Sequence, residues 1–127
     1  MLVSVFAIAS GGALGALARY GTVLLAQTYI GMQFPYGTLL VNSIGAFIIG
    51  FFMSFLLEHF VHLQFWYFFV VVGFLGGYTT FSSFAWETCM LYREGDFTGM
   101  CLNIILNNTV ALMMVVSGIM LGKRLSS

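Results

Sequence analysis

A cluster of polar and small residues interrupts an apolar stretch of the sequence and could contact ions. Residues 76–84 read Gly-Gly-Tyr-Thr-Thr-Phe-Ser-Ser-Phe, and no charged residue occurs between 59 and 86. Glycine, threonine and serine are weak helix formers, and the hydroxyls offer the backbone other hydrogen bonds. We therefore predict a break in a helix here, with a simple kink as the alternative. Unwound backbone would present carbonyl oxygens that can bind ions.

Two phenylalanines follow this cluster at helical spacing. Phe81 and Phe84 are three positions apart, so they share a face if the helix resumes there. Packing is the ordinary role of phenylalanine in an apolar helix. An aromatic ring also has a positive edge, which can contact a poorly hydrated anion. The sequence leaves both interpretations open.

Uncharged amides form a second polar pattern. Asn42 lies in an earlier apolar segment, and the last apolar segment carries Asn103, Asn107, Asn108, Thr109 and Ser117. Asn103 and Asn107 are four apart and share a helical face. One such amide usually joins two helices, whereas several together suggest a polar track. Amide N–H donors can replace the water shell of an anion and still release the ion.

Two charged residues fall inside apolar segments. A charge at the centre of a bilayer costs about 2.5–3.5 kcal/mol even on insertion scales, so such residues tend to be paired or to face water. Arg19 either snorkels to the membrane interface or has an internal structural role, with contact to a transported anion as a third interpretation. Glu87 is either a hydrogen-bonded structural carboxylate or part of a pathway.

Membrane helices must position these residues. The chain of 127 residues is 61% hydrophobic and 6% charged, far from the roughly 25% charged composition of soluble domains. Its charge-free segments approach or exceed the ~20 residues that a membrane crossing needs, and Pro35, the single proline, divides the longest. We predict an all-α integral membrane protein with one domain over residues 1–127. Its four helices should lie at about 2–27, 37–57, 65–91 and 97–122.

An even number of crossings places both termini on one side of the membrane. That side carries Lys123 and Arg124, and the other carries Arg93. Since positive residues normally mark cytoplasmic loops, this small difference fixes no orientation. A chain with so little bias can insert in both directions and pair with an inverted copy of itself.

Small residues are expected to pack the helices. Pairs such as Gly11 with Gly15 and Gly118 with Gly122 are spaced four apart, which lets helix backbones approach closely. We expect packing for nearly all of these glycines and treat Gly76 and Gly77 as exceptions. Cys89 and Cys101 have no paired spacing, so we expect small buried residues rather than a disulfide or metal site.

Three motifs together closely resemble the Fluc (CrcB) family of fluoride channels. They are the cluster at 76–84, Gly37-Thr38-Leu39-Leu40-Val41-Asn42, and Gly11-Gly12-Ala13-Leu14-Gly15-Ala16-Leu17-Ala18-Arg19-Tyr20. The resemblance implies a passive, fluoride-selective channel that lets cytoplasmic fluoride leave the cell and so protects against its toxicity. It implies four helices with the third broken near its middle, in an antiparallel, dual-topology homodimer. The protein would be multi-pass in the lipid of the cell (inner or plasma) membrane, with no enzyme activity and no nucleic-acid partner.

The resemblance also implies roles for individual residues. A structural sodium ion at the dimer centre would be bound by the backbone carbonyls of Gly76 and Thr79, and would activate or stabilise the channel. The expected fluoride pathway comprises Asn42, Phe81, Ser82, Ser83, Phe84, Glu87 and Asn107, and Arg19 would be structural. Ser83 stands where relatives commonly carry threonine. Val110-Ala111 stand where relatives carry Gly-Ser, so Asn107, Asn108 or Thr109 are the candidate replacements.

The alternative function is a proton-coupled small multidrug exporter, which is also a short four-helix dimer. Such an exporter needs a titratable acid in its substrate cavity, typically on its first helix. The first predicted helix here has no acidic residue. A third interpretation, a non-transporting membrane subunit, explains the packing glycines but neither the predicted break nor the polar track.

Overall fold

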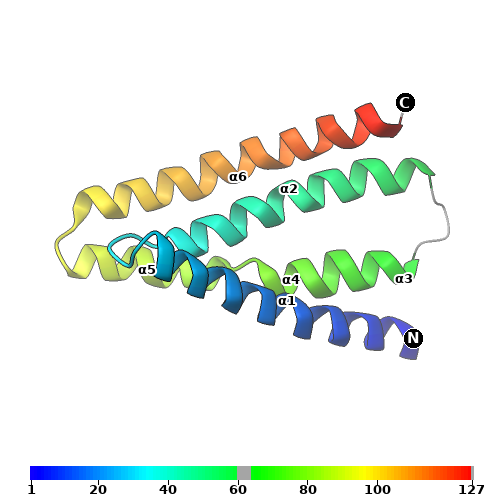
Figure 1. The fold of residues 1–127 in the computed structure, drawn as a ribbon, viewed down its shortest axis with the longest axis horizontal. Coiled ribbons are helices and arrows are strands. Elements are labelled where there is room, and N and C mark those ends of the chain that lie inside the picture. The colour runs from blue at the N-terminus through cyan, green and yellow to red at the C-terminus, as the bar shows by residue number, and fades with distance from the viewer. Residues whose placement is uncertain (60–63, 127) are drawn as a thin grey trace.

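The computed structural model of the chain describes residues 1–59 and 64–126, and over those ranges it contains helices and no strand. The elements are α1 (Leu2–Tyr29), α2 (Tyr36–His59), α3 (Gln64–Trp66), the π-helix η1 (Tyr67–Leu75), α4 (Gly76–Tyr78), α5 (Phe81–Arg93) and α6 (Phe97–Ser126). They form an elongated bundle in which both termini lie at the same end (Figure 1). The all-α prediction is confirmed.

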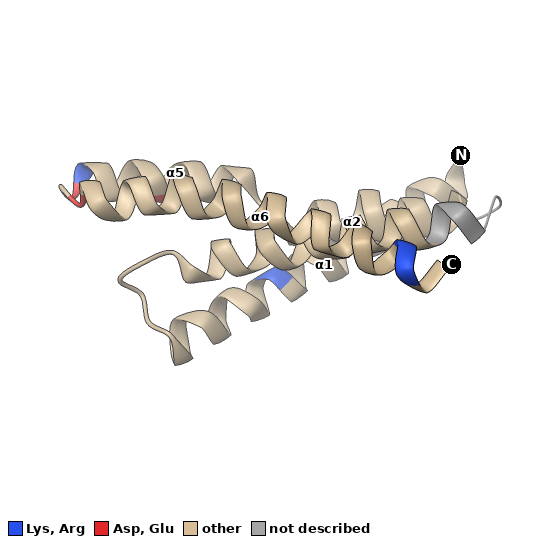
Figure 2. Ribbon diagram, turned by 90° about the horizontal axis from the view of Figure 1, so that it is seen from above, with Lys and Arg blue, Asp and Glu red and all other residues tan. Residues whose placement is uncertain are grey.

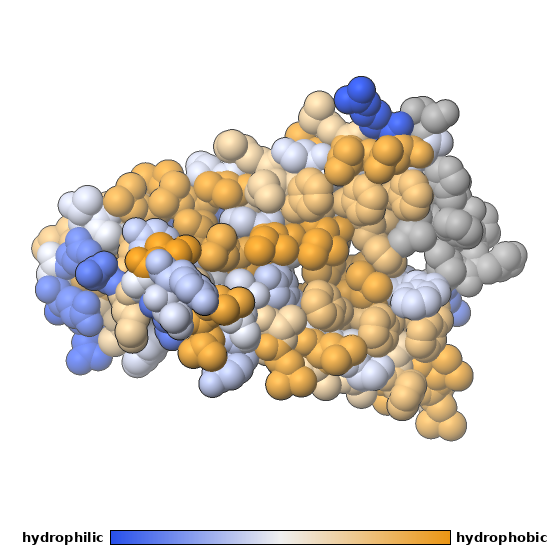
Figure 3. Space-filling model, in the orientation of Figure 1, coloured by the Kyte–Doolittle hydropathy of each residue, from blue (hydrophilic) through white to orange (hydrophobic). Residues whose placement is uncertain are grey.

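Four helical segments are long and apolar enough to cross a membrane, namely Leu2–Tyr29, Tyr36–Phe55, Gln64–Arg93 and Phe97–Ser126. Large apolar side chains cover the outside of the bundle; Leu2 is 82% exposed and Met120 is 67% exposed. Figure 3 shows this apolar surface along most of the length, with hydrophilic side chains gathered toward the ends. Apolar surface on this scale suits lipid or another chain rather than water. The protein is therefore a multi-pass membrane protein, as predicted.

The helix ends follow local sequence signals. The Pro35 carbonyl accepts the first bond of α2, from the Leu39 N–H at 3.2 Å. Gly31 has a φ of 122° and Gly95 a φ of 81°, so the turns after α1 and α5 use a conformation that favours glycine. At the start of α6, the Asp96 carboxylate accepts a bond from the Gly99 N–H at 2.8 Å and caps the helix.

Glycines bring the helices together in two pairs. α1 packs along η1 and α4, whereas α2 packs along α6. A Cβ at Gly15 would overlap the Phe74 backbone, and one at Gly118 would overlap the Phe47 backbone. Gly77 also packs, since its Cβ would lie 2.5 Å from the Gly12 carbonyl oxygen, so treating Gly77 as an exception was wrong. Gly76 alone of that pair faces open space.

The third span changes its neighbours between α4 and α5. η1 and α4 lie against α1, whereas α5 contacts α6 and α2. The connection is Thr79 (φ −81°, ψ 158°) and Thr80 (φ −153°, ψ 115°), both with extended backbone. We call these two residues the extended link; Figure 1 shows it as the thin connection between α4 and α5. It redirects the span from one half of the bundle to the other.

At the loop end of the bundle, α1 diverges from the remaining helices. Figure 2 shows the last turns of α1 and the connection to α2 apart from α5 and α6. Most charged residues lie toward the ends of the bundle in the same view. Arg19 lies in α1 and Glu87 in α5.

Both cysteines are on the surface of the single chain. Cys89 in α5 and Cys101 in α6 are free and exposed, so the expectation that they are buried was wrong. Hydrophobicity predicts that a residue avoids water, but it does not distinguish contact with lipid from contact with protein.

We predict that Gly15→Ala destabilises the fold. The new Cβ would overlap the carbonyl of Phe74, and backbone cannot move aside as a flexible side chain can. Overpacking of this kind typically costs about 1–3 kcal/mol. Gly21→Ala in the same helix is the matched control, since its Cβ would meet no atom within 4 Å. Thermal unfolding in detergent should show a lower midpoint for Gly15→Ala only; equal midpoints would contradict the close approach of α1 and η1.

Candidate ion path

The backbone polar groups of the extended link are all hydrogen-bonded. The Thr79 N–H donates to the Leu75 carbonyl at 3.0 Å, and the Thr79 carbonyl accepts from Arg19 Nη1 at 3.4 Å. The Thr80 N–H donates to Asn42 Oδ1 at 2.9 Å, and the Thr80 carbonyl accepts from Asn42 Nδ2 at 3.2 Å. Lipid offers no hydrogen bonds to unpaired backbone. Side chains from α1 and α2 therefore make the extended conformation tolerable inside a span.

The two threonine hydroxyls bond to the helices on either side of the link. Thr79 Oγ1 donates to the Leu75 carbonyl at 2.8 Å. Thr80 Oγ1 accepts from the Ser83 N–H at 3.2 Å and donates to Ser83 Oγ at 3.1 Å, which makes Thr80 the N-cap of α5. Ser82 is exposed, and its hydroxyl lies 3.3 Å from Thr80 Oγ1. The paired threonines thus end one helix and begin the next.

A series of hydrogen bonds, which we call the amide relay, leads away from the link. Asn42 Nδ2 donates to Asn107 Oδ1 at 3.0 Å, Asn107 Nδ2 to Asn103 Oδ1 at 2.8 Å, and Asn103 Nδ2 to Thr88 Oγ1 at 2.9 Å. Asn103 is 0% exposed and Asn107 is 7% exposed. Both N–H donors of Asn42 are thus engaged within the chain, one by Thr80 and one by Asn107.

The other candidate replacements on α6 bond within their own helix. Asn108 and Thr109 are exposed, and each donates to a carbonyl of its own helix, Ile104 at 2.7 Å and Ile105 at 2.7 Å respectively. Asn107 is the one of the three that bonds to another helix among the described residues.

One cavity gathers the sequence-predicted residues around the extended link. It has a volume of about 220 Å³ and is lined by Asn42, Thr79, Thr80, Phe81, Phe84, Asn107, Asn108 and Ala111. The rings of Phe81 and Phe84 have centroids 5.4 Å apart and planes inclined by 57°. Phe81 is 79% exposed in the single chain, whereas Phe84 is half-buried. Residues from α2, α5 and α6 thus meet at one place.

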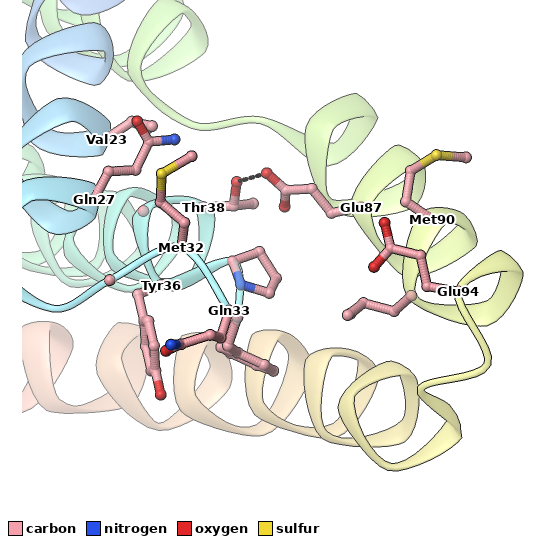
Figure 4. A pocket seen from close by; sticks show the side chains of 14 residues that line it. Val23, Gln27, Met32, Gln33, Tyr36, Thr38, Glu87, Met90 and Glu94 are labelled. Carbon is pink, nitrogen blue, oxygen red and sulfur yellow. Dashed lines mark hydrogen bonds between the residues drawn. The ribbon is translucent and has the colours of Figure 1, made fainter.

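A second cavity opens at the loop end of the bundle. It has a volume of about 220 Å³, and its lining includes Gln27, Gln33, Thr38, Glu87 and Glu94 (Figure 4). Thr38 Oγ1 donates to Glu87 Oε1 at 2.7 Å. Glu87 Oε2 is buried and has no hydrogen-bond partner within the described ranges. This oxygen leaves Glu87 able to accept a further hydrogen bond.

A third cavity, of about 310 Å³, shares residues with both others. It includes Thr38 and Glu87 from the loop-end cavity, Thr80 from the link, and also Arg19 and Ser83. The three cavities therefore form a series from the loop end of the bundle to the extended link. Ser83 and Glu87, two of the predicted pathway residues, line cavities of this series.

Arg19 reaches inward. Its side chain is half-buried and donates to the Thr79 carbonyl. A second contact ties α1 to the same region, because the hydroxyls of Thr22 and Tyr78 lie 3.1 Å apart. This geometry favours the internal structural role of Arg19 over snorkelling.

The carbonyls of Gly76 and Thr79 suit a cation in part. In an unbroken helix the Gly76 carbonyl would accept from the Thr80 N–H, but that donor bonds to Asn42. Arg19 uses one of the two lone pairs of the Thr79 oxygen and leaves the other. The described residues contain no group of three or more His, Cys, Asp or Glu side chains that could hold a metal. Two carbonyls cannot surround an ion, so further ligands would be needed.

The sequence alone indicates no role for Thr38 or Thr88, and it places Asn103 only in a polar pattern. One signal was available for Thr88. Thr88 and Asn103 lie at equal sequence distances from the Gly95-Asp96 turn, so antiparallel α5 and α6 bring them level. The contact of Thr38 with Glu87 spans elements distant in sequence and had no such signal.

The sequence of the chain is similar to those of several known proteins. Residues 6–119 match the family described as CrcB-like protein, Camphor Resistance (CrcB). A Legionella pneumophila (strain Lens) protein named Fluoride-specific ion channel FluC is 44% identical over 117 residues, which cover 92% of this chain and 87% of that protein. Proteins of the same name from Sulfurihydrogenibium sp. and Dehalococcoides mccartyi are each 42% identical; the matches cover 93% of this chain, and 95% and 91% of those proteins. The chain therefore belongs to the CrcB family, which confirms the resemblance found in its sequence.

Proposed function

We propose that this protein is a fluoride-selective channel through which cytoplasmic fluoride leaves the cell down its electrochemical gradient, protecting against fluoride toxicity. The observation that carries the proposal is the cavity where the extended link, Phe81, Phe84 and Asn107 meet. The ion itself comes from the names of the relatives, which are channels rather than enzymes. The chain would act as one four-helix domain in the inner or plasma membrane.

The series of cavities supports a path for the ion. Fluoride would enter beside Thr38 and Glu87, pass the hydroxyls of Thr80 and Ser83, and reach the ring edges of Phe81 and Phe84. A narrow path of this kind must replace the water shell of the ion with donors and positive ring edges.

The amides contribute to this path less directly than their chemistry suggests. Asn42 could donate to fluoride only by releasing Thr80 or Asn107, since both of its N–H groups are engaged. Asn107 Nδ2 is likewise engaged, with the carbonyl and the side chain of Asn103. Ser82 is exposed, as Phe81 is, and lines none of the three cavities.

We further propose an antiparallel homodimer. Phe81 is 79% exposed, and Gly76 is exposed with open space around it, although both lie within a candidate span. Lipid cannot bond to the Gly76 carbonyl, which lacks its helical donor, so a protein or ion partner would stabilise this surface. An inverted copy is consistent with the nearly balanced positive charge at the two ends.

A two-fold axis through that surface would bring the Gly76 and Thr79 carbonyls of both copies together. These oxygens would hold a structural sodium ion, because backbone carbonyls at an unwound segment are typical sodium ligands in membranes. The ion would offset the negative ends of the converging carbonyls and so hold the two copies in register.

Fluoride efflux from liposomes tests the path. Purified wild-type protein should release fluoride without an imposed proton gradient and should not pass chloride equally well. Phe81→Ile and Phe84→Ile should each slow efflux about tenfold or more, which corresponds to about 1.4 kcal/mol in the barrier. Phe6→Ile is the control, because Phe6 is also exposed, at 69%, but lies on α1 away from the cavity. Transport that depends on a proton gradient would instead support the exporter.

Gly76→Ala tests the proposed dimer and the sodium ion. Within one chain the new Cβ would meet no atom within 4 Å, and Gly76 has an ordinary helical φ of −61°, so the subunit should fold. At a two-fold interface the same methyl group would crowd the partner and the ion. We expect a weaker dimer in detergent and efflux that no longer rises when sodium replaces N-methylglucamine. Gly21→Ala, which is equally open, should change neither; if Gly76→Ala also changes neither, the proposed interface is wrong.

A further inference from the structure

The amide relay extends beyond the residues that line the proposed path. Its last member, Thr88, donates through Oγ1 to the Phe84 carbonyl at 2.7 Å. The relay therefore starts at Thr80 and ends at Phe84, which are both cavity-lining residues. Thr88 and Asn103 line none of the three cavities of the path.

From Asn42 onward, every bond that joins one member of the relay to the next runs in the same direction. Asn42 donates to Asn107, Asn107 to Asn103, Asn103 to Thr88, and Thr88 to Phe84. If the Asn103 amide turned over, its NH₂ group would face the NH₂ group of Asn107. The orientation of each amide is thus set by the next one, and aligned hydrogen bonds in a low-dielectric interior strengthen one another.

The relay encloses the first turn of α5. Thr80 caps this turn and is held by Asn42 from α2, while the Phe84 carbonyl at its other end is tied through Thr88 to Asn103 of α6. Asn103 is 0% exposed, so no water can take over a bond that the relay loses. The turn that carries Phe81 and Phe84 is therefore fixed to two other helices.

We propose that Asn103 and Thr88 are positioning residues of the ion path, which hold the extended link and the phenylalanine turn in place by orienting Asn107 and Asn42. The transport consequence rests on the proposed function, whereas the structural consequence does not. Without the Thr88 hydroxyl, Asn103 Nδ2 has no acceptor in the relay. The orientations of the Asn103, Asn107 and Asn42 amides are then no longer fixed, and Asn42 holds the Thr80 backbone less firmly. A change outside the cavities would then disturb the conducting geometry inside them.

Thr88→Val tests the proposal because valine keeps the shape of threonine and removes the hydroxyl. We expect the amide hydrogen of Thr80, followed by NMR on threonine-labelled protein, to exchange severalfold faster, and fluoride efflux to fall severalfold. Thr88→Ser restores the hydroxyl and should restore both measurements. Asn103→Leu, which cuts the relay at its centre, should match Thr88→Val.

Thr109→Val is the matched control. Thr109 is on α6, and its hydroxyl bonds to a carbonyl of its own helix at 2.7 Å, as that of Thr88 does, but it is exposed and outside the relay. It should leave both measurements at the wild-type level. Wild-type Thr80 exchange in Thr88→Val, or failure of Thr88→Ser to restore it, would overturn the proposal. Should the wild-type protein carry no fluoride, the proposed function fails, and Thr80 exchange still decides the role of the relay.

Discussion

The need to satisfy backbone hydrogen bonds in an apolar medium governs this structure. A helix meets that need within itself, but Thr79 and Thr80 are extended within a candidate span. Their groups must then find partners on other elements, and they find Arg19 and Asn42. Because Asn42 bonds to both the N–H and the C=O of Thr80, it replaces what the helix would have supplied. The positions of α1 and α2 around the link follow from this requirement.

Close packing of the helices brings the Arg19 and Asn42 side chains within reach of the extended link. α1 can approach η1 because Gly15 leaves space for the Phe74 backbone, and this approach brings Arg19 within reach of Thr79. On the other side, Gly45 of α2 leaves space for the methyl group of Thr79, where a Cβ would overlap it. A larger residue at either glycine would separate the link from its partners. Helix packing and the geometry of the site therefore depend on the same small residues.

The sequence predicts some of these features well because they depend on local composition. Four apolar segments predict four spans, and the weak helix formers at 76–84 include the two residues that are extended. The partners of those residues could not be predicted, since Asn42 and Thr80 are distant in sequence and meet only in the folded bundle. Packing of Gly77 and exposure of Cys89 were missed for the same reason: each depends on which face of a helix meets a neighbour. Thr88 is different, because the register of the α5–α6 hairpin places it beside Asn103.

The hydrogen bonds of the extended link also determine which groups remain available on each of its two sides in the proposed channel. On the side of α2 and α6, the Asn42 and Asn107 amides are already engaged, so the groups left for an anion are the ring edges of Phe81 and Phe84 and nearby hydroxyls. On the outer side, the Gly76 carbonyl loses its helical donor to Asn42, and a Cβ at Gly76 would meet no atom within 4 Å. An oxygen without a donor attracts a cation, and lipid provides none. The hydrogen bond from the Thr80 N–H to Asn42 holds the link extended. The same bond removes the helical donor of the Gly76 carbonyl, whose oxygen can then bind a second subunit or an ion.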